Sequence, residues 1–329
     1  MGVTAAVLAI DAGNSKTDVA FVAADGSVLA SHRGNLGFQP PKVGLDAAVD
    51  AIAAPVAAAL AQARAEGRDI DGVQHVSACL ANADLPVEEE QITAALHARG
   101  WAASTRVRND TFAILRAGVD EPRGVAVTCG AGINCVGMLP DGRTARFPAI
   151  GKISGDWGGG MGLAEESLWS AARADDGRGE PTELARTLPA HFGLGSMTEL
   201  IESLHLGGIP YARVHELTPV LFATSAAGDP VAQALVRRLA EEIVTMATVT
   251  LGKLDLLAEE APVVLGGGVL AARHTELDAH IGVLLAERAP KARAQVVVAP
   301  PVLGAVLLGL DEVEAPPASH ATSRAHYLP

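Results

Sequence analysis

The chain has 329 residues, of which 49% are hydrophobic and 19% are charged. The length corresponds to roughly two domains. The composition supports a sizeable buried core and excludes a disordered protein. The formal net charge is −13. A protein that binds nucleic acids or anionic membranes needs a basic face, so neither partner is expected.

The first predicted elements form an antiparallel meander. Val3–Ile10 is an apolar run rich in β-forming residues, and it ends at a polar turn, 11–14. A second strand follows at Thr17–Ala23. The Asp25-Gly26 turn, a strong hairpin signal, then leads to a third strand at Ser27–Ser31.

Helices and strands alternate between this meander and residue 118. The predicted helices are 45–66, 88–99 and 111–117, and the predicted strands are 74–80 and 105–108. Pro55 marks a kink or a break in the first helix. Asp110 stands at a strand-to-helix junction, where an aspartate considered by itself would cap the helix.

The meander pattern then recurs. An apolar strand at Gly124–Thr128 ends at the turn 129–132, a second strand follows at Ile133–Leu139, and the Asp141-Gly142 turn leads to Arg143–Phe147. The order and spacing match those of the first meander. This favours an internal duplication, with one copy opening each half, over two unrelated hairpins.

The second half is mostly helical. The predicted helices are 163–174, 182–188, 197–204, 212–227, 230–257, 276–287 and 301–310, and the predicted strands are 262–265 and 295–299. Arginine and glutamate pairs give helix 230–257 a solvated face. Trp157 and Trp169 are expected in the core, and the glycines at 158–160 predict a mobile loop.

Four glycine-bearing turns, at 11–15, 130–132, 155–160 and 266–268, each follow a short apolar strand. Glycine allows backbone N–H groups to approach an anion closely because no Cβ stands in the way. Four such turns favour a nucleotide bound between two lobes. The P-loop signature and the dinucleotide fingerprint are both absent from the sequence.

Three of these turns carry a resemblance. The run Asp11-x-Gly13-Asn14-Ser15-Lys16-Thr17-Asp18 resembles the first phosphate motif of the actin/hexokinase/Hsp70 superfamily. The run Cys129-Gly130-Ala131-Gly132-Ile133-Asn134 resembles the second, and Val264-Leu265-Gly266-Gly267-Gly268 resembles the adenosine motif. The ordered set covers the chain up to about residue 312.

Within that superfamily the chain is similar to the BadF/BadG/BcrA/BcrD family, which includes N-acetylglucosamine kinases and glucosamine kinases. Asn109-Asp110 ahead of a helix and Gly155-Asp156-x-Gly158 carry this closer resemblance. It implies an α/β fold of two RNase H-like (actin/hexokinase-type) lobes with a nucleotide cleft between them. We expect an N-terminal lobe at 1–118 joined by helix 303–312, a C-terminal lobe at 119–302, and a disordered tail at 313–329, which is rich in proline and serine.

The resemblance implies an ATP-dependent kinase that phosphorylates an amino sugar, N-acetylglucosamine or glucosamine, with Asp110 as the catalytic base. The residues expected to bind ATP and its phosphates are Asp11, Gly13, Asn14, Ser15, Lys16, Thr17, Gly130, Ala131, Gly132, Asn134, Ser225, Gly266, Gly267 and Gly268. Those expected to bind the sugar are Asn35, Asp110, Gly151 and Asp156. Asp11 would hold Mg²⁺ through water, because Mg²⁺ keeps several waters and takes few carboxylates.

Three departures from the family pattern bear on the choice of sugar. Ala131 replaces a threonine in the second phosphate motif, Ile150 replaces a tryptophan, and Trp157 replaces a glutamate. The first removes a hydroxyl, while the other two move an aromatic surface along the chain. N-acetylglucosamine is slightly favoured over glucosamine.

Two alternatives from other classes stay open: an ATPase that activates a radical dehydratase or reductase through an iron–sulfur cluster, and a sugar-sensing regulator without enzymatic activity. Three cysteines, Cys79, Cys129 and Cys135, are too few for a disulfide framework, so a cytoplasmic protein is expected. The longest apolar run near the C-terminus, 296–310, contains two prolines and is shorter than the roughly 20 residues of a membrane helix. We expect a small sugar as substrate and a homodimer.

Overall fold

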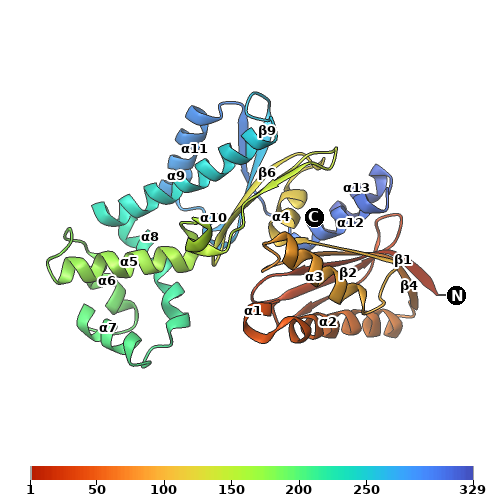
Figure 1. Cartoon of the computed structure of the whole chain (residues 1–329), viewed down its shortest axis with the longest axis horizontal. Coiled ribbons are helices and arrows are strands. Elements are labelled where there is room, and N and C mark those ends of the chain that lie inside the picture. Colours follow the sequence, from red (N-terminus) through yellow and green to blue (C-terminus); the bar gives the residue numbers. More distant parts are fainter. Residues whose placement is uncertain (1, 329) are drawn as a thin grey trace. The chain divides into compact units, whose positions relative to one another are not determined.

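The computed structural model describes residues 2–328, and the chain forms two five-stranded sheets with helices packed on them (Figure 1). The strand orders are β3-β2-β1-β4-β5 and β10-β9-β6-β7-β8. When β6 to β10 take the places of β1 to β5 and the second sheet is read from its opposite edge, the two orders are the same. The predicted duplication is therefore confirmed at the level of strand order.

The first sheet begins with the predicted meander. Its strands are β1 (Val3–Ala12), β2 (Thr17–Val22), β3 (Val28–Gly34), β4 (Ile70–Leu80) and β5 (Ser104–Asn109). β1, β2 and β3 pair antiparallel, whereas β4 pairs parallel with β1 and β5 parallel with β4. The helices of this part are α1 (Pro40–Val43), α2 (Leu45–Ala65), α3 (Pro86–His97) and α4 (Asp110–Gly118).

Side chains on the first sheet alternate between two faces. Leu8 and Ile10 of β1 belong to the buried hydrophobic cluster that includes residues of α2 and α3. Asp11 points to the opposite face, because successive side chains of a strand do so. Its register neighbours on that face are Asp18 of β2 and Cys79 of β4. The alternation of β1 thus separates a carboxylate from the apolar core.

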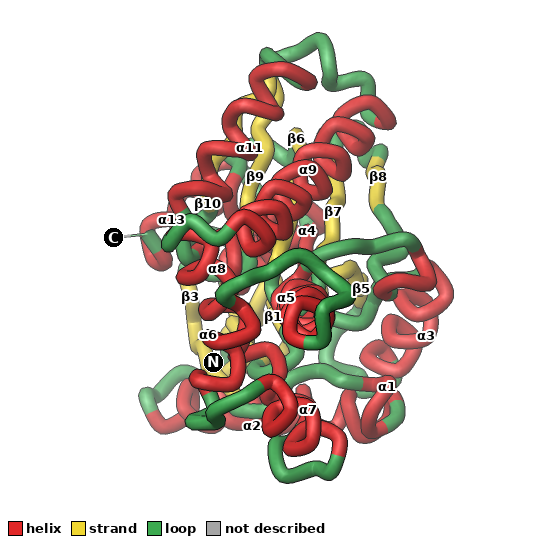
Figure 2. The backbone as a smooth tube through the Cα atoms, turned by 90° about the vertical axis from the view of Figure 1, so that its left-hand side faces the viewer, coloured by secondary structure: helices red, strands yellow, loops and turns green. Residues whose placement is uncertain are grey.

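The second sheet carries most of the remaining helices. Its strands are β6 (Gly124–Cys129), β7 (Ile133–Met138), β8 (Thr144–Arg146), β9 (Ala261–Gly266) and β10 (Ala292–Val296). Its helices are α5 (Gly159–Asp175), α6 (Leu184–His191), α7 (Met197–His205), α8 (Thr218–Ala226), α9 (Pro230–Lys253), α10 (Gly268–Ala271) and α11 (Thr275–Arg288), with 3-10 helices at Gly151–Ser154 and Tyr211–Leu217. The last two helices, α12 (Pro301–Glu312) and α13 (Pro317–Tyr327), belong with the first sheet, where α12 packs on β1, β4 and α4. α9 and α11 lie side by side (Figures 1 and 2).

The chain divides into two compact units. One contains the residues up to Ala126, Val136–Pro148, and the residues from Val297 onward; the other contains Val127–Cys135 and Ala149–Val296. The predicted lobes differ from these units mainly because residues 136–148 and the C-terminal tail join the first unit.

One local prediction is narrowed and two need correction. Of the kink or break predicted at Pro55, the break is excluded, because α2 continues as one helix from Leu45 to Ala65. The last strand, predicted at 295–299, is β10 at Ala292–Val296, because it pairs in register with β9. The helix predicted at 212–227 consists of a 3-10 helix followed by α8.

One described helix, α2, has the length and apolar composition that could cross a membrane. In the structure α2 lies on the first sheet, where it contacts β2 and β3. Its buried residues, among them Val49, Ile52 and Val56, recur at helical spacing and form part of the hydrophobic cluster. The composition of α2 is therefore accounted for by core packing.

The tail predicted to be disordered forms the helix α13. Ser319 and Ser323 are buried, and their hydroxyls donate to the carbonyl oxygens of Ala24 and Gly26, both at 2.7 Å. The Arg324 side chain donates to three carbonyl oxygens at the end of α4, those of Arg116, Ala117 and Val119. The prediction of disorder is wrong because these serines hydrogen-bond a distant turn, which local composition does not reveal.

Gly26→Ala is expected to lower the melting temperature more than Gly142→Ala. Both glycines end an Asp-Gly turn, with φ of 84° and 87°, so both alanines incur a left-handed backbone cost of about 1–2 kcal/mol. A Cβ at Gly26 would stand 1.9 Å from the carbonyl oxygen of Ser319, whereas a Cβ at Gly142 meets nothing within 4 Å. Thermal denaturation of both variants measures the difference, and equal shifts would contradict the docking of α13 on this turn.

Candidate active site

Asp11 lies near the end of β1 and is only 6% exposed. Burial raises its pKa well above the usual value; the charges of Asp110 and Asp18 raise it further, while Lys16 and Arg33 lower it. Asp18 is already paired with Arg33, whose Nε lies 2.6 Å from the carboxylate. Asp11 is therefore a buried carboxylate that a cation would stabilise. Asp110 lies close enough for its negative charge to act on Asp11.

The turn after Asp11 is supported by the loop at residues 34–39. Thr17 is buried, and its hydroxyl donates to the carbonyl oxygen of Leu36 at 2.8 Å. A Cβ at Gly37 would stand 2.2 Å from the carbonyl carbon of Asn14, so only glycine fits there. The Thr17 hydroxyl thus holds the loop, while binding of phosphate by Thr17 stays a prediction.

The turn itself is open on its outer side. A Cβ at Gly13 would meet nothing within 4 Å, so an anion can approach the backbone there. The Gly13 N–H donates to the carbonyl oxygen of Lys16 at 3.1 Å, which leaves the amides of Asn14 and Ser15 as the candidates for phosphate binding. Asn14, Ser15 and Lys16 are exposed, as is Asn35 on the supporting loop.

Asp110 is the first residue of α4, but it is not the helix cap. The N-cap is Asn109, whose side chain accepts from the N–H of Thr111 at 2.9 Å. Burial raises the pKa of Asp110 to about 6, while hydrogen bonds from the backbone N–H groups of Thr111 and of Asp110 itself lower it. Such a carboxylate is ionised at neutral pH and still basic enough to accept a proton.

Asn109 is in turn held by side chains that no sequence motif indicated. Its Nδ2 donates to Asp84 Oδ1 at 2.7 Å, and its backbone N–H donates to Glu89 Oε1 at 3.1 Å. Glu89 also accepts from Arg146 Nη1 at 2.5 Å. Because Asn109 directly precedes Asp110, these bonds position the candidate base.

The second phosphate turn lies against the N-terminal end of α5. The N–H of Gly160 donates to the carbonyl oxygen of Gly130 at 2.7 Å, and the N–H of Met161 donates to that of Ala131 at 3.1 Å. A Cβ at Gly159, where φ is +73°, would stand 2.5 Å from Cα of Gly132. Close packing therefore accounts for the glycines at 158–160, in place of the expected mobile loop.

The outer side of this turn is open as well, because a Cβ at Gly130 or at Gly132 would meet nothing within 4 Å. The Gly130 N–H donates within the turn to the carbonyl oxygen of Gly132 at 2.9 Å, so the amides of Ala131 and Gly132 are the phosphate candidates. Asn134 is buried, and its Oδ1 accepts from the N–H of Cys135 at 2.7 Å. This contact favours a supporting role for the Asn134 side chain.

The residues predicted near adenosine lie in the same unit as the second turn. Gly267 has φ of +86°, and a Cβ there would stand 2.5 Å from the carbonyl oxygen of Cys129. Ser225 on α8 is buried, and its hydroxyl donates to Glu276 on α11. Gly266–Gly268 therefore adjoin the phosphate turn, while contact of Ser225 with adenosine stays a prediction.

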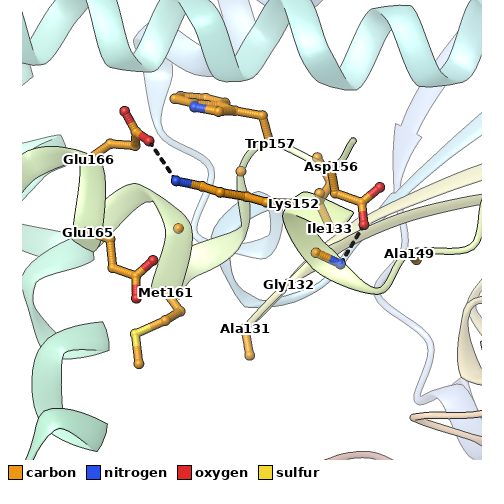
Figure 3. A pocket seen from close by; sticks show the side chains of 13 residues that line it. Ala131, Gly132, Ile133, Ala149, Lys152, Asp156, Trp157, Met161, Glu165 and Glu166 are labelled. Atoms are coloured by element: carbon orange, nitrogen blue, oxygen red, sulfur yellow. Dashed lines mark hydrogen bonds and ion pairs between the residues drawn. The ribbon is translucent and has the colours of Figure 1, made fainter. Parts of the chain in front are cut away.

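A cavity of about 300 Å³ lies beside the second turn and α5 (Figure 3). Its lining includes Ala131, Gly132, Gly151 and Asp156 among the predicted site residues. Asp156 Oδ2 accepts from the Gly151 N–H at 2.8 Å and from the Ser154 hydroxyl at 2.7 Å. The cavity thus brings two of the predicted sugar-binding residues next to the phosphate turn.

Trp157 lines this cavity rather than the core, as its place among the departures from the family pattern indicated. Sequence reasoning missed its neighbour on α9: the Arg238 guanidinium lies 4.1 Å from the centroid of the Trp157 ring. Burial raises the pKa of Glu242, and the charge of Asp156 contributes, while Arg238 lowers it. The four-residue spacing of Arg238 and Glu242 puts both on one helix face, which is the signal that could have found them. Trp169, also predicted in the core, is 61% exposed.

Curated relatives of the chain include two sugar kinases. The N-acetyl-D-glucosamine kinase of Dictyostelium discoideum is 24% identical over 312 residues, which cover 92% of this chain and 97% of that protein. The N-acetylmuramic acid/N-acetylglucosamine kinase of Clostridium acetobutylicum is 25% identical over 204 residues, which cover 62% of this chain and 67% of that protein.

Solved structures show the same fold. A Chromobacterium violaceum protein assigned as an N-acetylglucosamine kinase has a TM-score of 0.70 at 22% identity, over 93% of this chain and 99% of that one. A ROK family glucokinase of Streptomyces griseus, in complex with glucose and AMPPNP, has a TM-score of 0.53 at 19% identity, over 93% and 98% of the two chains. The fold is thus the actin/hexokinase-like fold, as predicted.

The model of the BadF/BadG/BcrA/BcrD ATPase family matches residues 8–309. This range contains β1 and the first phosphate turn, Asp110, the second phosphate turn and the glycines after β9. It ends within α12, before the helix α13. With so much of its length matched, the chain belongs to the BadF/BadG/BcrA/BcrD ATPase family.

Proposed function

We propose that the protein is an ATP-dependent kinase of an amino sugar, N-acetylglucosamine or glucosamine. The observation that carries the proposal is Asp110, a carboxylate at the start of α4 whose capping role is taken by Asn109 and whose pKa burial raises to about 6. Family membership and the two curated sugar kinases support the choice of substrate class.

In the proposed reaction a sugar hydroxyl oxygen attacks the γ-phosphorus of ATP. The new O–P bond forms as the bond between the γ-phosphorus and its bridging oxygen breaks, ADP leaves, and the hydroxyl proton passes to the Asp110 carboxylate. The transition state is loose and anionic, so positioning and charge stabilisation supply most of the acceleration. The amides of Asn14, Ser15, Ala131 and Gly132 are our candidates for holding the β- and γ-phosphates.

Asp11 fits the proposed Mg²⁺ role. It is buried, and it lies in the field of Asp18 and Asp110, so a divalent cation would offset an unfavourable accumulation of negative charge. When bound there, Mg²⁺ would supply positive charge that offsets the negative charge developing on the transferred phosphate. Asp11 would orient waters of the ion, while Lys16, which is exposed and 3.9 Å from Asp18, would remain at the rim of the turn.

Asn35, Gly151 and Asp156 are proposed to hold the sugar. Asp156 keeps its position through the hydrogen bonds from Gly151 and Ser154, so its carboxylate can accept from a sugar hydroxyl without first being ordered.

We also propose a cytoplasmic location and a homodimer, with size-exclusion chromatography coupled to light scattering as the test of the oligomeric state.

The alternative of an iron–sulfur ATPase finds no specific support in the thiols. Cys79, Cys129 and Cys135 are buried, and burial raises the pKa of the last two thiols to about 12. The Cys135 sulfur lies 3.2 Å from the Thr250 hydroxyl. A cluster needs thiolates, and these environments disfavour them.

The test of the proposal is an ADP-release screen of the purified protein against hexoses, hexosamines and N-acetylhexosamines. Stimulation of ADP release by an amino sugar above the water background is the expected result, and no stimulation by any sugar would refute the kinase assignment. The ratio of kcat/KM for N-acetylglucosamine to that for glucosamine then decides between the two, and we expect a ratio above one.

The pH profile of kcat/KM is expected to fall below a pH of about 6. Asp110 must be ionised to accept the proton, and burial raises its pKa to about 6, so activity rises with pH through that value and levels off above it. Below it, kcat/KM should drop about tenfold per pH unit. Steady-state rates between pH 4.5 and 8 measure the profile, after incubation controls show that the protein stays folded. A flat profile through pH 6 would argue against Asp110 as the base.

A further inference from the structure

The cavity beside the second phosphate turn carries more negative than positive charge. Its lining includes three carboxylates, Asp156, Glu165 and Glu166, and one ammonium group, Lys152 (Figure 3). Glu165 and Glu166 extend from α5, while Lys152 comes from the 3-10 helix Gly151–Ser154 and Asp156 from the short loop between that helix and α5. The formal charges of these side chains therefore sum to −2.

Lys152 does not stand free in this cavity. Its Nζ lies 3.5 Å from Glu166 Oε1, and the dashed line in Figure 3 marks this ion pair. The Lys152 side chain is 76% exposed but that of Glu166 only 23%, so the carboxylate is the better fixed partner. Glu165 is anchored separately, because its Oε1 accepts from the Tyr211 hydroxyl at 2.9 Å.

We propose that the Lys152–Glu166 pair makes the protein select against sugars that carry a carboxylate; this inference rests on the proposed sugar-kinase function. A sugar held at Asp156 would share the cavity with Glu165 and Glu166, which line it as well. A carboxylate there would be repelled by both, because the one ammonium group of the lining is already paired with Glu166. An acetamido group is uncharged and meets no such repulsion.

N-acetylmuramic acid provides the matched probe. It is N-acetylglucosamine with a lactyl ether, so it adds a carboxylate and leaves the acetamido group in place. The Clostridium acetobutylicum relative is named for both sugars. We expect this chain to accept N-acetylglucosamine with a kcat/KM at least about 100-fold above that for N-acetylmuramic acid.

The experiment compares the ratio of the two kcat/KM values in four proteins. Glu166→Gln removes one negative charge and releases Lys152, so the preference for N-acetylglucosamine should narrow by at least about tenfold. Lys152→Gln should not narrow the preference for N-acetylglucosamine. The double variant Lys152→Gln/Glu166→Gln should narrow this preference less than Glu166→Gln alone, because no ammonium group is left to pair with the lactyl carboxylate.

Glu183→Gln is the matched control. Glu183 pairs with Arg186 at 2.8 Å on the exposed surface and does not line the cavity, so its loss should leave the ratio unchanged. The inference is overturned if the wild-type protein uses both sugars equally well. It is also overturned if Glu166→Gln leaves the ratio where it was, or if Glu183→Gln moves it as far.

Calorimetric titration with each sugar in the absence of ATP separates this inference from the kinase proposal. If no sugar is phosphorylated but N-acetylglucosamine binds, N-acetylmuramic acid does not, and Glu166→Gln restores binding, the selectivity stands and the kinase assignment fails. If neither sugar binds and neither is phosphorylated, both are refuted. Turnover of N-acetylglucosamine with no effect of Glu166→Gln refutes the selectivity alone.

Discussion

Asp110→Asn is expected to lower kcat by about 10²–10⁴-fold with the fold retained. Asparagine has nearly the same size and shape as aspartate, but its amide cannot accept the proton of the sugar hydroxyl. The helix keeps its cap, because the N-cap is Asn109. Burial disfavours the charged form of Asp110, as its raised pKa shows, so a neutral side chain should leave the melting temperature unchanged or raise it.

The matched control is Asp46→Asn. Asp46 is also an aspartate in the first turn of a helix, α2, but it is exposed and takes no part in the site. Its replacement should leave kcat within the error of the measurement. Steady-state kinetics with saturating ATP, together with thermal denaturation and a nucleotide-binding measurement, make the comparison. A kcat near the wild-type value for Asp110→Asn would leave this carboxylate without a catalytic role.

Gly132→Ala is expected to raise the KM for ATP at least about tenfold without lowering the melting temperature. Gly132 does not have a positive φ, and a Cβ there would meet no protein atom within 4 Å, so the folded chain tolerates alanine. The open space in front of the turn is where a phosphate would approach the backbone. The methyl group would occupy that space and hold the phosphate away from the amides.

Gly159→Ala is the opposite case. Its φ is +73°, and a Cβ would stand 2.5 Å from Cα of Gly132 and 2.7 Å from the carbonyl oxygen of Ala131. The second turn would have to move, so the melting temperature should fall and ATP binding should weaken along with it. Thermal denaturation with and without ATP, and the KM for ATP, separate the two variants. A large loss of stability in Gly132→Ala would contradict the open geometry of the turn.

The strands and turns of both hairpins were predictable because their signals are local. Alternating or continuous β-forming residues and the Asp-Gly turns at Gly26 and Gly142 act within a few residues, and the observed strands begin and end close to the predicted positions. The duplication could be inferred in the same way, since the two copies repeat the order of these local signals. The resemblance added the candidate base and the phosphate turns.

The roles of individual side chains were less predictable. Thr17 stands inside a phosphate motif, yet its hydroxyl is used by Leu36. The Asp110 position suggested a cap, yet Asn109 has that role, because the residue that precedes the helix has the extended backbone a cap requires. A motif specifies which residues follow one another. It does not specify which acceptor lies nearest to each hydroxyl or amide.

The sequence by itself determined the order of helices and strands, the two glycine-bearing turns at 11–15 and 130–132 and the placement of Asp110 between a strand and a helix, because hydrophobic periodicity and turn-forming residues act over short stretches of chain. Only the tertiary structure decided that residues 317–327 form a docked helix and that Arg238 stacks on Trp157. It alone decided that Lys152 is paired with Glu166 in an acidic cavity. Each of these contacts depends on which surfaces the folded chain brings together, and the free energy that orders the groups comes from partners many residues away.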